Sequence, residues 1–182
     1  MLNLFREDYY RYYGIQWEWK MLLNLFRDHS LWYLFLFRIL QVGQPFIIRR
    51  ILSIFLYLTQ KKYGLEIPLG TQIDKGLYIG HAYNITINQH AKLGNNINIH
   101  KGVTIGQENR GKRKGTPTIG NFVWIGVNAT IVGKISVGND VLIAPNSFVN
   151  IDIPSHSIVI GNPCKIIPCN NATAFYINKV VE

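Results

Sequence analysis

The sequence of 182 residues contains few cysteines, few charged residues and no long uninterrupted hydrophobic run. Its two cysteines, Cys164 and Cys169, are too few for a disulfide framework and lack the CxxC spacing of a zinc site. We therefore expect reduced thiols, a cytoplasmic location and no bound metal. The N-terminal segment carries acidic and basic residues but no apolar core, so we expect no secretory signal.

The longest apolar run starts at Leu31 and is interrupted at Arg38. It is shorter than the roughly 18–20 residues that a membrane-spanning helix requires. Two alternatives remain for this apolar segment: burial in an oligomer, which we favour, or peripheral docking on an anionic membrane through its basic and aromatic residues. The net charge of +9 suits an anionic ligand. No RNP-like, helix-turn-helix or zinc-finger motif is present, so we expect no nucleic-acid partner.

Glycine is nearly absent from the first third of the chain, which is rich in aromatic residues. The pattern predicts helices over residues 4–13, 17–30, 31–41 and 45–62. Ser30 is the predicted N-cap of the third helix, and Pro45 suits the first turn of the fourth. We therefore assign residues 1–62 to an α-helical N-terminal segment.

From residue 67 the composition changes, and aliphatic residues recur at every sixth position. This period fits neither an amphipathic helix nor an alternating strand, and it is typical of a hexapeptide solenoid. Three hexads form one roughly triangular coil, with the aliphatic side chain inside and Gly, Asn or Asp at the corners. The sequence therefore predicts a mainly β chain, with a parallel β-helix of about five coils over residues 63–168 and a tail over 169–182. The inward positions are Ile67, Ile73, Ile79, Ile87, Leu93, Ile99, Ile105, Ile119, Ile125, Ile131, Val137, Ile143 and Val149.

The six-residue rhythm is interrupted twice. The step from Ile79 to Ile87 is eight residues, with two extra residues directly after His81. The step from Ile105 to Ile119 is 14 residues, so about eight residues within "QENRGKRKGTP" should leave the coil as a loop. Because loops at solenoid corners are common binding sites, these two interruptions are the candidate functional positions.

Residues Glu66 to Ile167 resemble the left-handed β-helix acyltransferases, in particular the serine acetyltransferase branch. The resemblance is carried by "GLYIGHAYNITIN", "GVTIGQENRGKRKGTPTIG", "VWIGVNATIVGKISVG" and "IPSHSIVIGNPCKII". It implies a left-handed coil, a homotrimer and acetyl-CoA bound in a groove between subunits. A dimer of trimers stays open.

The resemblance implies that His81 is the catalytic histidine. An imidazole can take the proton of an acceptor hydroxyl and later protonate the departing thiolate. Glu66 takes the place of the family's aspartate and would orient the His81 ring. His100, about one coil further on, is the alternative base.

Candidate coenzyme-binding residues lie beyond the histidines. Trp124, Gly126 and Ala144 lie on regular coils, where small residues would let the pantetheine arm approach backbone N–H groups that polarise the thioester oxygen. By the resemblance, Lys165 would lie near the nucleotide end of the coenzyme. Arg113, in the 107–117 loop, would attract its phosphates or an anionic acceptor.

The acceptor prediction rests on two departures from the family. The family's aspartate before the histidine is Gly80 here, and its Arg-His-Pro is Gly115-Thr116-Pro117. A zwitterion such as serine would lack charged partners at these positions. We therefore predict transfer to a saccharide hydroxyl in capsule or exopolysaccharide biosynthesis. Serine O-acetylation in cysteine biosynthesis is the alternative, and an inactive β-helix scaffold is a third hypothesis.

Overall fold

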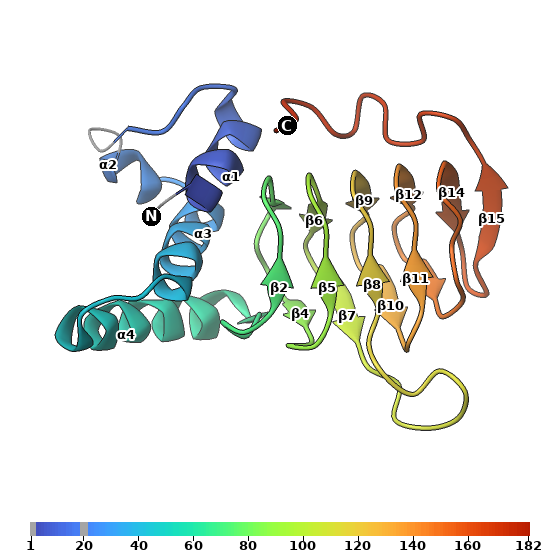
Figure 1. The fold of residues 1–182 in the computed structure, drawn as a ribbon, viewed down its shortest axis with the longest axis horizontal. Coiled ribbons are helices and arrows are strands. Elements are labelled where there is room, and N and C mark those ends of the chain that lie inside the picture. The colour runs from blue at the N-terminus through green and yellow to red at the C-terminus, as the bar shows by residue number, and fades with distance from the viewer. Residues whose placement is uncertain (1–2, 19–21) are drawn as a thin grey trace.

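The computed structural model describes residues 3–18 and 22–182. The first part of the chain is helical, and the second is a coil of short strands (Figure 1). The helices are α1 (Asn3–Tyr13), α2 (Leu22–Leu25), α3 (His29–Gln41) and α4 (Phe46–Tyr63). The strands are β1 (Leu65–Glu66), β2 (Gln72–Ile73), β3 (Tyr78–Gly80), β4 (Ile85–Ile87), β5 (Lys92–Leu93), β6 (Asn98–His100), β7 (Thr104–Gly106), β8 (Thr118–Ile119), β9 (Val123–Ile125), β10 (Thr130–Val132), β11 (Ser136–Val137), β12 (Val141–Ile143), β13 (Phe148–Val149), β14 (Ser157–Ile160) and β15 (Lys165–Pro168).

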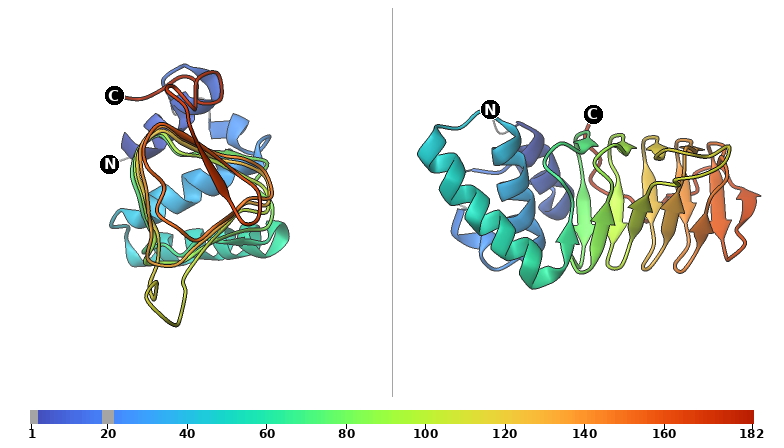
Figure 2. Two further views of the ribbon diagram at one scale, coloured as in Figure 1. Left: turned by 90° about the vertical axis from the view of Figure 1, so that its right-hand side faces the viewer. Right: turned by 90° about the horizontal axis from the view of Figure 1, so that it is seen from below.

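The strands form the three faces of a left-handed β-helix of about five coils. Sheet A contains β1, β4, β7, β10 and β13, sheet B contains β2, β5, β8 and β11, and sheet C contains β3, β6, β9, β12, β14 and β15. Successive strands within each sheet pair in parallel, except that β15 returns antiparallel to β14. Seen along its axis, the coil has a roughly triangular outline from which one loop projects (Figure 2). The predicted fold class is confirmed.

The hexad positions fill the interior of the coil. Every inward aliphatic residue predicted from the sequence is buried, from Ile67 to Val149. Folding of the coil removes these apolar side chains from water. Their burial is therefore the main source of apolar stabilisation of the coil. The projecting loop lies between β7 and β8 and is closed by a bridge between Glu108 and Gly115, so the long interruption of the rhythm is a loop as predicted.

The helix boundaries differ from the sequence prediction. Asp28, not Ser30, caps α3: its Oδ1 accepts the N–H groups of Ser30 at 2.8 Å and Leu31 at 3.3 Å. Pro45 is the N-cap of α4 rather than part of its first turn. The predicted helix over 17–30 is mostly wrong, because Trp17 and Glu18 are not helical and α2 is a single turn; residues 19–21 lie outside the described part.

The apolar helix α3 is buried inside its own chain. Its side chains pack between the other helices and the open end of the coil, and Tyr33, Leu34 and Leu36 are fully covered. The prediction that an oligomer is needed to bury this segment is therefore wrong. None of the helices in the described ranges is long and apolar enough to cross a membrane.

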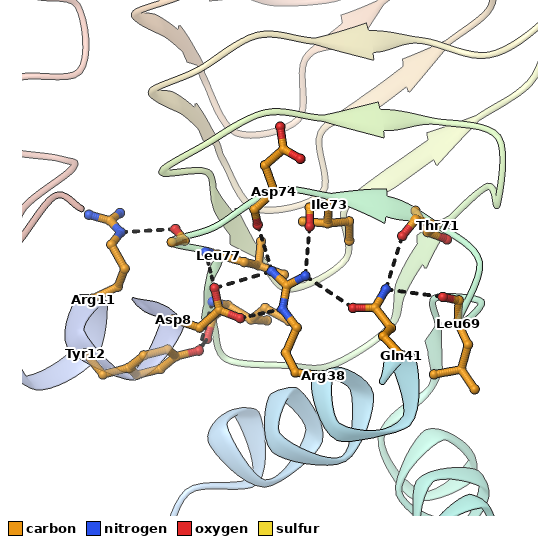
Figure 3. Close-up of polar contacts among 12 residues, drawn as sticks. Asp8, Arg11, Tyr12, Arg38, Gln41, Leu69, Thr71, Ile73, Asp74 and Leu77 are labelled. Carbon is orange, nitrogen blue, oxygen red and sulfur yellow. Dashed lines mark hydrogen bonds and ion pairs between the residues drawn. The ribbon is translucent and has the colours of Figure 1, made fainter. Parts of the chain in front are cut away.

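A buried ion pair fastens the helices to the first coil (Figure 3). Arg38 on α3 donates from Nε to Asp8 on α1 at 2.7 Å, and both side chains are almost fully buried. Arg38 also donates to the carbonyl oxygens of Ile73 at 2.8 Å and Asp74 at 2.7 Å. Asp8 in turn accepts the N–H of Leu77 at 2.7 Å. One pair of charges thus holds two helices and the chain before β3 in a fixed relation.

The C-terminal tail runs back along the coil towards α1 (Figure 1). Asp140 Oδ1 accepts the N–H of Thr173 at 2.9 Å near the distal end. Further along, Tyr176 packs on Trp124 with ring centroids 5.1 Å apart, and Arg11 donates to the carbonyl of Asn178. The tail therefore covers part of sheet C.

Replacing Arg38 by Met should destabilise the protein strongly, because it leaves the Asp8 carboxylate buried without its cation. The expected loss of unfolding free energy is about 3–5 kcal/mol, measured by urea denaturation at one protein concentration. Arg49→Met removes the same charge from an exposed position of α4 and should change stability by less than about 0.5 kcal/mol. Equal stabilities of the two variants would contradict the role given to the buried pair.

Candidate active site

His81 lies at the corner between β3 and β4, where sheet C gives way to sheet A. Its φ of 56° places it in the left-handed region, which Asn residues occupy at other corners such as Asn96 and Asn128. A non-glycine residue in this region costs about 1 kcal/mol, and Asn, Asp and His occupy it more often than other side chains do. Its side chain is exposed. Phe122 and His156 occupy the same region at other corners, so the backbone conformation alone does not mark His81 as catalytic.

The N-terminus of α3 docks on the His81 corner. Ser30 Oγ accepts the N–H of Ala82 at 3.4 Å. The ring of His29 stacks on Tyr63 with centroids 4.5 Å apart and lies 4.8 Å from Tyr83. These contacts hold the N-terminus of α3 against the corner that carries His81.

A pocket of about 390 Å³ opens between these elements. His81 and Tyr78 contribute the coil side, and Arg27 and Asp28 contribute the turn before α3. The α1 side is formed by Tyr12, whose hydroxyl donates to the Ile79 carbonyl at 3.0 Å and accepts the Ile79 N–H at 2.9 Å. The histidine thus faces a walled cavity of mixed charge.

A column of residues leads from His81 along the same edge of the coil. Gly80 pairs with His100 in the register of β3 and β6. Continuing the registers of sheet C places Gly126 beside His100, and Ala144 beside Gly126, in the next two coils. Trp124 lies on the same sheet and lines a second pocket of about 280 Å³ with His100. The structure thus brings most of the predicted coenzyme residues to one edge.

His100 is held tightly in this column. Its ring lies 4.8 Å from Trp124 and 6.4 Å from Tyr78, and its buried Nε2 has no hydrogen-bond partner within the described part of the chain. Burial, followed by the charge of His81, lowers the pKa of His100. Burial also lowers the pKa of His29; Asp28 opposes that shift, and His81 and Lys62 add to it. Both histidines that neighbour His81 are therefore biased towards the neutral form.

Other predicted site residues lie elsewhere. Glu66 is on sheet A, paired with Thr86, and faces a different pocket beside α4. No hydrogen bond or ion pair joins it to His81 in the residues that the structure describes. Arg113 is in the loop at the corner between sheets A and B and pairs with Glu108 at 3.1 Å. Lys165 is exposed at the start of β15, at the distal end of the coil.

One part of the coenzyme prediction fails on backbone geometry. The N–H of Gly126 donates to the carbonyl of Ile143 at 2.9 Å, and the N–H of Ala144 donates to Val159 at 2.8 Å. Both groups are used by the ladder between coils. They are consequently not free to polarise a thioester oxygen.

Sequence reasoning missed Arg27, Asp28 and His29 as residues near His81. They are more than 50 positions away in the chain, and nothing in the local sequence shows where the start of α3 docks. The available signal was the "RDH" turn directly before the apolar helix, since Asp at such a position is a strong N-cap. It would have corrected the cap but not placed the turn beside the histidine.

Comparison with known proteins supplies the family. The family model described as bacterial transferase hexapeptide (six repeats) matches residues 116–150. A serine acetyltransferase of Helicobacter pylori is 35% identical over 150 residues, which cover 82% of this chain and 86% of that protein. The chain belongs to the serine acetyltransferase family. It is an O-acetyltransferase, as predicted.

Solved structures agree with this membership. Serine acetyltransferase of Neisseria gonorrhoeae, in complex with serine, matches with a TM-score of 0.69 and 29% identity, over 91% of this chain and 67% of that one. The soybean apoenzyme matches with a TM-score of 0.67 and 27% identity, over 90% of this chain. The chain spans 66% of the soybean protein's length.

The prediction of a saccharide acceptor in capsule or exopolysaccharide biosynthesis is wrong. Both the sequence relatives and the structural neighbours are serine acetyltransferases, which supports the alternative reading instead. The prediction relied on the missing charges at Gly80 and at Gly115-Thr116. It did not take into account Arg27 and Asp28, which the turn before α3 brings into the pocket of His81.

Adding a methyl group at Gly80 should destabilise the fold, because a Cβ there would lie 2.6 Å from Nδ1 of His100. We expect Gly80→Ala to cost about 1–3 kcal/mol of unfolding free energy. His100→Ala in the same chain should remove most of the penalty. Gly106→Ala, whose Cβ would meet Val132 at an ordinary 3.4 Å, is the control. A penalty that persists in the double variant would contradict the Gly80–His100 packing.

The lowered pKa values of His29 and His100 predict a pH dependence of stability. Because protonation is disfavoured in the folded state, the unfolded state binds more protons as pH falls through the ordinary value of 6.5. Stability is therefore full above that pH and is lost below it. The double variant His29→Gln, His100→Gln should show a smaller loss of melting temperature between about pH 7.5 and 5. His90→Gln, at an exposed position, should lose as much melting temperature as the wild type. If the wild type, the double variant and His90→Gln all show the same pH dependence, the prediction is wrong.

Proposed function

We propose that the protein is a serine O-acetyltransferase, which moves the acetyl group of acetyl-CoA to the hydroxyl of L-serine. The observation that carries the proposal is the 35% identity to a serine acetyltransferase over 82% of the chain. Its support in the fold is a histidine that lines a pocket with charges of both signs. The family's reaction needs both features.

His81 would perform both proton transfers. Its neutral imidazole accepts the proton of the serine hydroxyl while the oxygen attacks the thioester carbonyl. The new C–O bond forms, the C–S bond breaks, and the imidazolium returns its proton to the departing sulfur. No acyl-enzyme is needed when both substrates are held together, because positioning lowers the barrier.

The column beyond His81 is the proposed path of the coenzyme. His100, Gly126 and Ala144 follow one another along one edge of sheet C, and the pantetheine arm would run along this edge. Trp124 would pack against the arm, and Lys165 and Arg113 would attract phosphate groups. Glu66 stays a predicted orienting residue for His81, without a direct contact in the single chain.

We also propose the homotrimer predicted from the sequence. The outward side of α4 supports association, because Ile47, Ile51, Ile54 and Leu58 are exposed along it. An apolar stripe of this extent is uncommon on a monomer.

Replacing His81 by Asn should abolish most activity while keeping the fold. Asn tolerates the left-handed corner that His81 occupies, so stability should be unchanged or slightly higher. Loss of the general base should lower kcat for serine-dependent release of CoA by about 10²–10⁴-fold. Free thiol is followed with acetyl-CoA and L-serine.

His90→Asn, at an exposed turn, is the matched control and should retain wild-type rates. A wild-type enzyme that releases no CoA with serine would disprove the proposed acceptor. Full activity of His81→Asn would disprove the proposed base.

A further inference from the structure

The His81 pocket lacks the two charged positions by which the family resemblance would recognise a zwitterion. Gly80 has no side chain, and a Cβ there would lie 2.6 Å from Nδ1 of His100, so this position carries no carboxylate. Gly115 and Thr116 lie in the loop at the corner between sheets A and B. An amino acid acceptor therefore needs other partners for its ammonium and carboxylate groups, because burying either charge unpaired is costly.

The turn before α3 carries two adjacent opposite charges in the wall of this pocket. Arg27 is exposed and lines the cavity, and it has no ion pair or hydrogen bond to any residue that the structure describes. Asp28 uses only Oδ1 to cap α3, and its Oδ2 accepts no hydrogen bond from the residues that the structure describes. Both residues share the pocket with His81.

The position of this turn is fixed rather than free. Ser30 bonds to the backbone of the His81 corner, and His29 is packed between Tyr63 and Tyr83. Asp28 is half-buried beside these residues, where its charge is less screened than at an open surface. Two opposite charges on a turn held beside a base can select a substrate by charge as well as bind it.

We propose that Arg27 and Asp28 determine acceptor specificity: Arg27 binds the carboxylate of the amino acid, and Asp28 Oδ2 binds its ammonium group. The proposal rests on the proposed function, because it assigns the recognition of serine within the same pocket. The turn before α3 thus supplies the charges that are missing at Gly80 and at Gly115-Thr116.

Acceptor analogues that each lack one charge test the two roles separately. The rates are measured with acetyl-CoA and L-serine, L-serinamide (no carboxylate) or 3-hydroxypropanoate (no ammonium). Arg27→Gln should raise KM and lower kcat/KM for serine by about 10- to 100-fold, as expected for a lost charged hydrogen bond. It should leave the already poor rate with L-serinamide unchanged.

Asp28→Asn keeps a residue that caps helices well, so α3 should still form. The substitution should lower kcat/KM for serine and for L-serinamide by a similar factor. It should leave kcat/KM for 3-hydroxypropanoate unchanged. The KM for acetyl-CoA should stay at its wild-type value in both variants. Arg49→Gln removes a cation from α4 outside the pocket and should have no effect on any acceptor.

The outcomes separate this inference from the function on which it rests. If the wild type acetylates serine and both variants retain its kcat/KM, the charge pair does not bind the acceptor and the inference is wrong, while the proposed function stands. Equal losses with all three acceptors would also overturn it, since that result indicates a damaged fold. If the wild type does not acetylate serine, the proposed function fails and the inference falls with it.

Discussion

The buried pair of Arg38 and Asp8 is the interaction on which the rest of the architecture depends. A β-helix coil can stack without helices, but its first coil would end in open backbone and an uncovered apolar column. Arg38 ties α3 to the carbonyls of Ile73 and Asp74, and Asp8 ties α1 to Leu77. Because each charge is buried, the pair tolerates little displacement. It therefore fixes where both helices meet the start of the coil.

That fixed relation builds the pocket. With α1 held in place, Tyr12 reaches the backbone of Ile79, and with α3 held in place, Asp28 and Ser30 meet the corner after β3. The coil contributes His81 in a strained corner conformation, and the helices contribute the walls and the charges. The coil and the helical segment are each incomplete as a site. The Arg38–Asp8 pair joins α3 to α1, and its hydrogen bonds to the backbone of Ile73, Asp74 and Leu77 join both helices to the coil.

The sequence predicted the coil in detail because its rule is local. A period of six identifies each inward position, and all of them from Ile67 to Val149 are buried. The same period found His81 and the 107–117 loop as departures from the rhythm. The acceptor pocket could not be predicted in this way, since it depends on how residues 27–30 dock on residues 78–83. The wrong prediction of a saccharide acceptor followed from this. The local sequence showed that charged residues are missing at Gly80 and Thr116, but it did not show that Arg27 and Asp28 lie in the same pocket as His81.

The most direct test of this account is a crystal structure of the protein with bound L-serine. We expect the serine hydroxyl within hydrogen-bond distance of a His81 ring nitrogen, the carboxylate on Arg27 and the ammonium group on Asp28 Oδ2. Serine bound by residues of the 107–117 loop, with no contact to the turn before α3, would contradict the claim that docking of the helices on the first coil creates the acceptor site.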